Sequence, residues 1–321
     1  MSTARLRQIL QEEYGLQVES IEAIERGYSN QSFRVATAET ELVLRCGWPG
    51  KPSARAASEE SVLSWLATHP GALHVPTVLP TVAGNAHVPW EGRTLHLFTT
   101  VPGEVLYRWD KACSDAHLDA SIRALSELHE RLRPLPLGAQ AAPLQVYRDQ
   151  LAALEEPGIV DRILTATELG LQLQRELPTF VAKARRIVDR AESTLPASSP
   201  LQWCHGDYQL ENLLFVDDAL MGLVDFDTVR VLPPGMDLAF ALFNLTRDGS
   251  DEECFRWDRE RWRRGAQSDG TDLAGQLTDE DWVRLYCVDQ SLMHLRSGMD
   301  AVWALDEGIG FLPVFRGVLA A

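Results

Sequence analysis

The chain is poor in lysine and in positive charge overall. Its 30 basic residues include only three lysines, and its 46 acidic residues give a formal net charge of −16. Non-specific affinity for nucleic acids comes largely from neutralising phosphates, so this balance argues against a nucleic-acid partner. It suits a cationic small molecule better.

Paired cysteines and long apolar runs are also missing. The five cysteines are widely spread, odd in number and contain no C-x-x-C pair, which predicts reduced thiols and neither a disulfide framework nor a cysteine zinc site. The first residues carry charges every few positions, and no stretch approaches 18 uncharged apolar residues. We therefore expect a cytoplasmic protein with no signal peptide and no membrane partner.

Three polar residues between positions 203 and 227 have the spacing of a phosphoryl-transfer site. Asp207 ends a His-Gly-Asp sequence, Asn212 follows five residues later, and Asp225 begins an Asp-Phe-Asp sequence. Phosphoryl transfer needs one carboxylate to accept the proton of the attacking hydroxyl. It also needs amide and carboxylate oxygens to hold magnesium against the nucleotide phosphates. Protein kinases use the same spacing.

Two short apolar runs connect these residues. Residues 213–216 and 220–224 are separated by the turn residues Asp217 and Asp218, a pattern that predicts a β-hairpin. Such a hairpin would return Asp225 to the side of Asn212.

The sequences CHGDYQLENLL and LVDFD resemble those of the aminoglycoside phosphotransferase and choline kinase family, whose catalytic loop runs H-G-D-x-x-x-x-N. The resemblance implies an α+β, bilobal protein-kinase-like fold. Residues 1–102 would form a nucleotide-binding lobe with a five-stranded antiparallel sheet and helices. Residues 103–321 would form a mainly helical catalytic and substrate-binding lobe. It further implies ATP or GTP as the phosphoryl donor, Asp207 as the catalytic base, and Mg²⁺ bound by Asn212 and Asp225.

The same resemblance assigns residues that would bind the nucleotide. Arg45 stands on a strand where kinases usually carry a phosphate-binding lysine, and no lysine precedes Lys51. Glu59 occupies the position of the glutamate that pairs with this cation. Glu60 is one helical step away, about 100° round, so only one of the two can face Arg45. A solvated Arg45 and an exposed Glu59 are the alternatives.

Two loops complete the expected nucleotide site. The turn that contains Gly27, Ser29 and Asn30 matches the family's phosphate loop, although with a single glycine it is equally typical of an ordinary hairpin turn. Backbone groups at Thr100 and Val101 correspond to the hinge that would bond the adenine edge.

Apolar periodicity predicts helices over residues 3–13, 54–68 and 118–132, two or three helices over 144–195 broken at Pro157-Gly158 and at Pro178, and a last main helix opened by Thr278. The arginine-rich stretch 255–264 predicts an exposed, salt-bridged helix.

Asp237 is expected to brace the catalytic loop and His205 to hold its shape, with Asp227 near the metal. The acids Asp289, Asp300, Asp306 and Glu307 are candidates for substrate contacts, each with a solvated surface position as its alternative.

The acceptor is not determined by these motifs. The family resemblance implies transfer of the γ-phosphoryl group to a hydroxyl of a small molecule, aminoglycoside-like or an amino alcohol, with a serine or threonine of a peptide as an alternative. A nucleotide-binding pseudokinase without catalysis and a nucleotidyl transferase are the other readings that the sequence leaves open.

Overall fold

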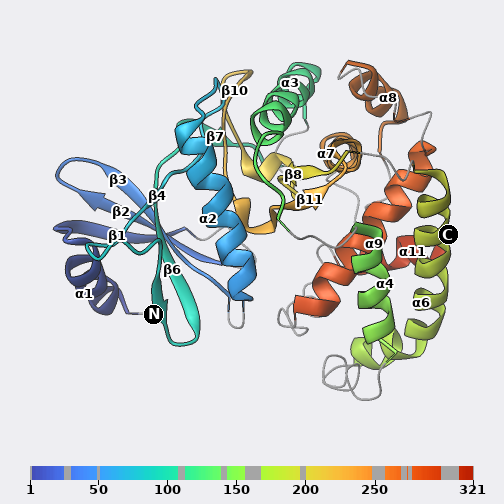
Figure 1. Ribbon diagram of the computed structural model, residues 1–321, viewed down its shortest axis with the longest axis horizontal. Coiled ribbons are helices and arrows are strands. Elements are labelled where there is room, and N and C mark those ends of the chain that lie inside the picture. The colour runs from blue at the N-terminus through green and yellow to red at the C-terminus, as the bar shows by residue number, and fades with distance from the viewer. Residues whose placement is uncertain are drawn as a thin grey trace.

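The computed structural model describes residues 2–24, 30–48, 51–107, 113–138, 143–155, 168–195, 200–247, 257–268, 273, 277–297 and 311–320. Figure 1 shows a sheet-rich part formed by the earlier residues beside a larger, mainly helical part. The buried apolar side chains of the described residues fall into two clusters, one under the sheet and one among the later helices. The predicted α+β class, with an antiparallel N-terminal sheet and a helical C-terminal part, is confirmed.

The N-terminal sheet is antiparallel at every pairing. Its strands, in spatial order, are β1 (Val18–Ile24), β2 (Gln31–Thr37), β3 (Glu41–Cys46), β6 (Arg93–Thr99) and β4 (Val78–Leu79), and β5 (Val88–Trp90) also pairs with β6. This sheet therefore has six strands among the described residues, where five were expected. The extra strand fits because β6 is long enough to pair with β5 at its start and with β4 near its end.

Helix α1 (Thr3–Tyr14) completes the core of the sheet and confirms the helix expected at residues 3–13. Leu6, Ile9 and Leu10 are buried at three- and four-residue steps, which places them on one face of the helix. They belong to the same apolar cluster as Leu44 of β3.

Helix α2 (Ser53–Thr68) connects the sheet to the helical part. Its apolar residues Val62, Leu63 and Leu66 are buried in the larger of the two cores. Glu59 lies on the same face, three, four and seven residues away from them, and its side chain is also fully buried. A buried carboxylate is stable only when a cation is beside it, so the position of α2 depends on the partner of Glu59.

The larger part contains α3 (Asp115–Leu132), α4 (Pro143–Ala153), α6 (Glu168–Thr194), α7 (Pro234–Thr246), α8 (Arg259–Ser268), α9 (Asp279–Ser297) and α11 (Phe311–Ala320). Helix α3 begins three residues before the predicted start because the Ser114 hydroxyl accepts the backbone N–H of His117 at 3.1 Å. Thr278 caps α9 as predicted, with its hydroxyl accepting the backbone N–H of Asp281 at 3.2 Å.

The expected helix break at Pro178 is wrong, since α6 continues through this proline. Proline removes one helical hydrogen bond and usually ends or kinks a helix. Here the apolar face is continuous across it, because Leu177 on one side and Phe180, Val181 and Ala184 on the other are all buried. This burial offsets the missing hydrogen bond. Pro157-Gly158 lies outside the described residues.

The hairpin predicted between Asn212 and Asp225 is confirmed. β9 (Leu213–Val216) and β10 (Ala219–Leu223) pair antiparallel, and β7 (Glu104–Val105) extends them to three strands. A two-stranded sheet of β8 (Gln202–Cys204) and β11 (Arg230–Leu232) flanks the hairpin. The short 3₁₀ turn η1 (Leu210–Asn212) precedes β9 and η2 (Phe226–Thr228) follows β10, so both lie at the open end of the hairpin.

Residues 259–264 of the arginine-rich stretch lie on α8 and form the exposed, salt-bridged helix that was predicted, whereas residues 255 and 256 lie outside the described residues. On α8, Arg259 pairs with Glu280 at 2.7 Å and Arg263 with Asp279 at 2.9 Å. Across the helical part as described, no helix is both long and apolar enough to cross a bilayer.

Candidate active site

Gly206 sets the backbone course of the catalytic loop that follows β8. Its φ of 79° lies in the left-handed region that glycine tolerates best. A Cβ atom at this position would lie 2.4 Å from the carbonyl oxygen of Thr228. The loop can therefore pass close to η2 only because residue 206 has no side chain.

Asp237 on α7 binds the same loop through its carboxylate. Its carboxylate accepts the backbone N–H of Gly206 at 3.0 Å and a hydrogen bond from Nε2 of His129 at 2.9 Å. Burial alone would raise the pKa of Asp237, but the hydrogen bonds from His129 and Gly206 bring this pKa below its usual value. Asp237 is thus an ionised, buried brace, in line with the supporting role expected for it.

His205 fixes the loop from inside. The backbone N–H of Asp207 donates to Nδ1 of His205 at 3.3 Å, so Nε2 carries the proton and donates to the carbonyl of Val224 at 3.1 Å. Burial lowers the pKa of His205, which keeps the ring neutral and suited to this pair of bonds. The ring joins the start of the catalytic loop to the end of the hairpin.

Asp207 and Asn212 lie in direct contact. Nδ2 of Asn212 donates to the Asp207 backbone carbonyl at 2.8 Å and to its carboxylate at 3.2 Å. The side-chain amide of Gln209 also donates to the Asp207 carboxylate, at 3.1 Å. Because the amide nitrogen of Asn212 is engaged with Asp207, its oxygen is the atom suited to a metal ion.

The hairpin brings Asp225 back to this pair. The backbone N–H of Val224 donates to the carbonyl of Asn212 at 2.9 Å. Asp225 itself has a φ of 60°, a left-handed conformation that costs a non-glycine residue about 1–2 kcal/mol and is concentrated at functional sites. Its side chain remains 43% exposed. Partial burial and the neighbouring acids Asp227 and Glu59 raise the pKa of Asp225, while Arg45 acts in the opposite direction.

Arg45 of β3 and Glu59 of α2 form a buried ion pair. Arg45 is 8% exposed and Glu59 is fully buried. The second arm of the guanidinium reaches Asp225 at 3.4 Å, and the group lies 4.8 Å from the centroid of the Phe98 ring. Burial alone would raise the pKa of Glu59, but Arg45 and Lys51 lower it below its usual value. Of the two adjacent glutamates, Glu59 is the one that faces Arg45.

Lys51 is the residue that sequence reasoning missed. Its ammonium group lies 3.2 Å from Glu59 and pairs with Asp227, and its side chain is only 2% exposed. No lysine occupies β3, but the segment between β3 and α2 brings one to the same carboxylate. The sequence did contain a hint of this role. Lysine is rare in the chain, with three in all, and Lys51 stands only six residues after Arg45.

Asp227 links the hairpin to the N-terminal sheet. It pairs with Lys51, and its carboxylate accepts a hydrogen bond from the amide of Asn30 at 3.4 Å. Burial alone would raise the pKa of Asp227, but the neighbouring Lys51 and Arg45 lower it to about 2. Asn30, the last residue of the turn after β1, therefore contacts one of the acids of the site. Gly27 and Ser29, expected in the same turn, lie outside the described residues.

The expected hinge follows β6. The hydroxyl of Thr100 donates to the carbonyl of Glu41 at 3.4 Å. Val101 lies against Gly222 of β10. A Cβ atom added at Gly222 would lie 2.1 Å from the Val101 side chain. These contacts fix the connection between the sheet and the hairpin, and the adenine contact proposed for Thr100 and Val101 stays a prediction.

Taken together, two cations and three carboxylates meet where α2, β3 and the end of β10 converge. Arg45 and Lys51 face Glu59, Asp225 and Asp227, which leaves one net negative charge beside Asp207 and Asn212. Hard oxygen ligands with excess negative charge suit Mg²⁺, and the cations suit phosphate oxygens. This donor set fits a magnesium nucleotide.

Comparison with known families agrees with this geometry. The sequence model of the phosphotransferase enzyme family matches residues 20–284. The chain belongs to this family. No curated protein matches it.

Several solved structures share the fold of this chain. They include APH(2'')-IIa in complex with gentamicin (13% identity, 100% of this chain and 97% of that one, TM-score 0.64). A spectinomycin phosphotransferase in complex with ADP and spectinomycin has 11% identity, with 99% and 94% covered and a TM-score of 0.58. A macrolide 2'-phosphotransferase from Brachybacterium faecium has 17% identity, with 98% and 97% covered and a TM-score of 0.54.

Asp289 of α9 is buried and paired inside the helical part. It is 2% exposed and forms two bonds to Arg230, at 2.5 and 2.8 Å, and it accepts the hydroxyl of Tyr147 at 2.8 Å. Arg230 in turn reaches the carbonyl of Gly206 at 3.5 Å. The alternative of a solvated surface position is therefore wrong for Asp289, because its charge is neutralised inside the helical part. Asp300, Asp306 and Glu307 lie outside the described residues.

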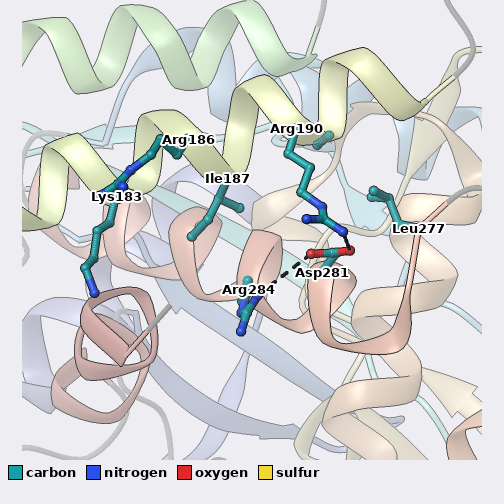
Figure 2. Close-up of a pocket in the computed structure, with 8 residues that line it drawn as sticks. Lys183, Arg186, Ile187, Arg190, Leu277, Asp281 and Arg284 are labelled. Carbon is teal, nitrogen blue, oxygen red and sulfur yellow. Dashed lines mark ion pairs between the residues drawn. The ribbon is translucent and has the colours of Figure 1, made fainter.

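A separate hollow of about 150 Å³ lies between α6 and α9 (Figure 2). Its basic side chains include Arg186, Arg190 and Arg284, and Asp281 pairs with Arg190 at 2.9 Å. None of the residues assigned to phosphoryl transfer lines this hollow. It is therefore distinct from the catalytic loop of the phosphotransferase.

The Gly206→Ala variant should be destabilised by about 2–4 kcal/mol and lose most of its activity, because the methyl group strains φ and displaces Thr228. Gly84→Ala is the matched control, since Gly84 has a φ of 84° and open space where a Cβ would lie. It should lose only about 1 kcal/mol. Urea unfolding and turnover of both variants test this, and equal losses would contradict the proposed close approach.

Asp227 should make stability depend on pH. Its folded pKa of about 2 lies below its ordinary value, so the stability it contributes is complete above that ordinary value. This contribution disappears as the pH falls through 4 towards 2, and it amounts to about 2 kcal/mol. In urea unfolding, the deficit of Asp227→Asn relative to wild type should shrink as the pH is lowered from 6 to 3. A deficit that stays constant between pH 6 and pH 3 would contradict this origin.

Proposed function

We propose that this phosphotransferase transfers the γ-phosphoryl group of ATP to a hydroxyl group of a small molecule. The observation that carries the proposal is the convergence of Asp207, Asn212 and Asp225 with the buried Arg45–Glu59 pair. One side of the site is suited to activate a hydroxyl, and the other to hold polyphosphate. The ADP complex of a relative with the same fold supports a nucleoside triphosphate as donor.

Asp207 is the proposed catalytic base. It orients the acceptor hydroxyl and takes its proton while the acceptor oxygen bonds to the γ-phosphorus. The bond from that phosphorus to the bridging oxygen breaks, and the nucleoside diphosphate leaves with the electron pair. Asn212 and Gln209 hold the Asp207 carboxylate in place during this step. Such positioned proton transfer contributes about 10²–10⁴ in rate.

Asn212 and Asp225 are the residues that would hold Mg²⁺. When bound, the ion would neutralise negative charge on the nucleotide phosphates. In the arrangement described here, Arg45 and Lys51 neutralise Asp225 and Asp227. We infer that both cations turn towards phosphate oxygens when the nucleotide is present, with Glu59 as their fixed anchor.

The remaining nucleotide contacts follow from position. Asn30, with Gly27 and Ser29 in the same turn, is proposed to lie over the phosphates, and the backbone at Thr100 and Val101 to bond the base. Antibiotic acceptors in relatives support a small-molecule acceptor, and the net charge of −16 favours a cationic one.

The decisive experiment compares wild type with Asp207→Asn in a screen of hydroxyl acceptors. Aminoglycosides, macrolides, amino alcohols, sugars and serine peptides are incubated with magnesium and either ATP or GTP, and the products are analysed by mass spectrometry. A mass gain of one phosphoryl group should appear with wild type and fall about 10²–10⁴-fold in the variant. Gain of a nucleotidyl group would instead show nucleotidyl transfer. Nucleotide binding without any turnover would show a pseudokinase.

Lys51 should share nucleotide binding with Arg45. We expect Lys51→Met to raise the KM for ATP roughly 10- to 100-fold, because a charge-assisted contact to phosphate is lost. Lys183→Met removes a lysine from α6 and serves as the control. An unchanged KM for ATP in Lys51→Met, together with a large rise in Arg45→Met, would confine Lys51 to a structural role.

A further inference from the structure

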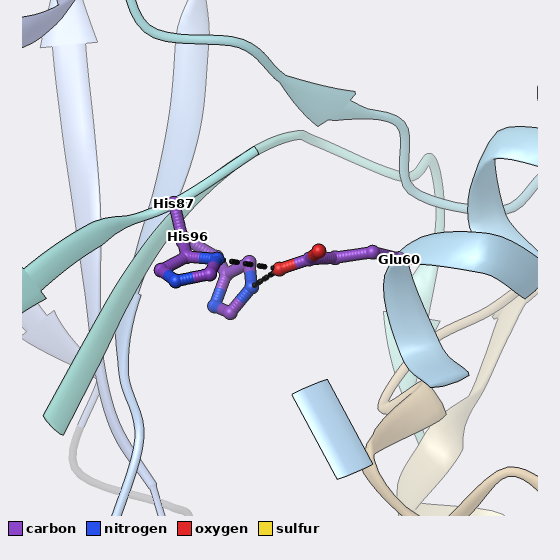
Figure 3. Close-up of side chains that lie close together, drawn as sticks. All are labelled: Glu60, His87 and His96. Atoms are coloured by element: carbon purple, nitrogen blue, oxygen red, sulfur yellow. Dashed lines mark hydrogen bonds and ion pairs between the residues drawn. The ribbon is translucent and has the colours of Figure 1, made fainter. Parts of the chain in front are cut away.

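Three side chains that the proposed reaction does not use meet on the side of α2 next to the one that carries Glu59. Oε1 of Glu60 accepts hydrogen bonds from Nδ1 of His87 at 2.7 Å and from Nε2 of His96 at 2.8 Å (Figure 3). Glu60 stands on α2, His87 just before β5, and His96 on β6. The cluster therefore joins the helix to two neighbouring strands of the sheet.

The donor atoms of this cluster form a metal-ligating set. One carboxylate oxygen and two imidazole nitrogens all lie within 4.8 Å of one another. Ligand atoms around a tetrahedral zinc ion, each about 2.0–2.1 Å from it, are about 3.3 Å apart. The nitrogen-to-oxygen distances of 2.7 and 2.8 Å need to open by only about 0.5 Å to reach that spacing.

The charge states of Glu60 and His96 suit a metal ion, which would bind each histidine through the nitrogen that now faces Glu60 once the ring proton has moved to the other nitrogen. Burial alone would raise the pKa of Glu60, but the hydrogen bonds from His96 and His87 lower it below its usual value. Burial lowers the pKa of His96 despite the nearby carboxylate. An ionised carboxylate and a neutral imidazole are the forms that bind metal ions.

Exposure also suits a site that exchanges its ion. The side chain of His96 is 1% exposed and is held in the sheet, whereas His87 is 33% and Glu60 21% exposed. The cluster is thus anchored on one side and open to solvent on the other, where a water molecule could complete four ligands. A second cluster in the described residues, His129, Cys204 and Asp237, is fully buried and already braces the catalytic loop.

We propose that Glu60, His87 and His96 form a zinc site, separate from the magnesium site. Two imidazoles with one carboxylate favour zinc over magnesium or calcium, which prefer oxygen ligands throughout. The site adjoins the Arg45–Glu59 pair through two of the three segments that carry it. Glu60 follows Glu59 in α2, and His96 pairs with Arg45 across the β3–β6 ladder. A bound ion therefore ties α2 to the sheet at the level of the Arg45–Glu59 pair.

The test is metal binding by the untagged full-length chain after chelator treatment, without nucleotide. Zn²⁺ is titrated calorimetrically, and Co²⁺ is titrated in parallel with visible absorbance as the readout. Wild type should bind one Zn²⁺ at this site, with a Kd at least 100-fold lower than that of His87→Gln. Co²⁺ should give the intense band of a four-coordinate site containing nitrogen. Zn²⁺ should also raise the Tm of wild type but not of His87→Gln.

Two further variants make the result specific. His69→Gln removes an exposed histidine at the end of α2 and should bind Zn²⁺ like wild type. Asp225→Asn alters the proposed magnesium site and should also keep the Zn²⁺ site.

Binding that survives in His87→Gln but is lost in Asp225→Asn would place the ion at the catalytic loop and overturn the proposal. Absence of saturable binding in wild type would also overturn it and leave the cluster as a hydrogen-bonded brace. Neither result depends on phosphoryl transfer, so the two proposals fail independently.

Discussion

The buried charge cluster around Glu59 is the interaction on which the arrangement of this protein depends. Glu59 is fully buried, and both Arg45 and Lys51 converge on it. Removing one partner from a buried ion pair typically costs about 3–5 kcal/mol, because the remaining charge cannot be solvated. The same cations reach Asp225 and Asp227, so this one requirement for neutrality holds α2, β3 and the end of the hairpin together.

Adjacent residues of α2 serve two different partners because of helix geometry. Glu59 and Glu60 are separated by about 100° around the helix axis, so they cannot face the same group. Glu59 faces Arg45, while Glu60 faces His87 and His96. The helix is therefore attached to the sheet through two carboxylates on neighbouring sides.

The catalytic loop is positioned by buried polar contacts from the helical part. Asp237 holds Gly206 from α7, and Asp289 of α9 holds Arg230, which reaches the same glycine. Charged groups withdrawn from water in this way give directional bonds and allow little displacement. The loop therefore presents Asp207, the proposed catalytic base, from a rigid support, as catalysis by positioning requires.

The sequence by itself determined the local features of this protein. The hairpin and the buried faces of the helices follow from periodicity, and the contact between Asp207 and Asn212 follows from their short separation in the chain. These features could therefore be predicted. Only the tertiary structure decided the partners of buried charges. Lys51 reaches Glu59 across a connecting segment, Asp289 is neutralised by Arg230, and Pro178 is retained within a helix by burial on both sides. Each of these outcomes depends on desolvation and packing between distant segments, which no local pattern encodes.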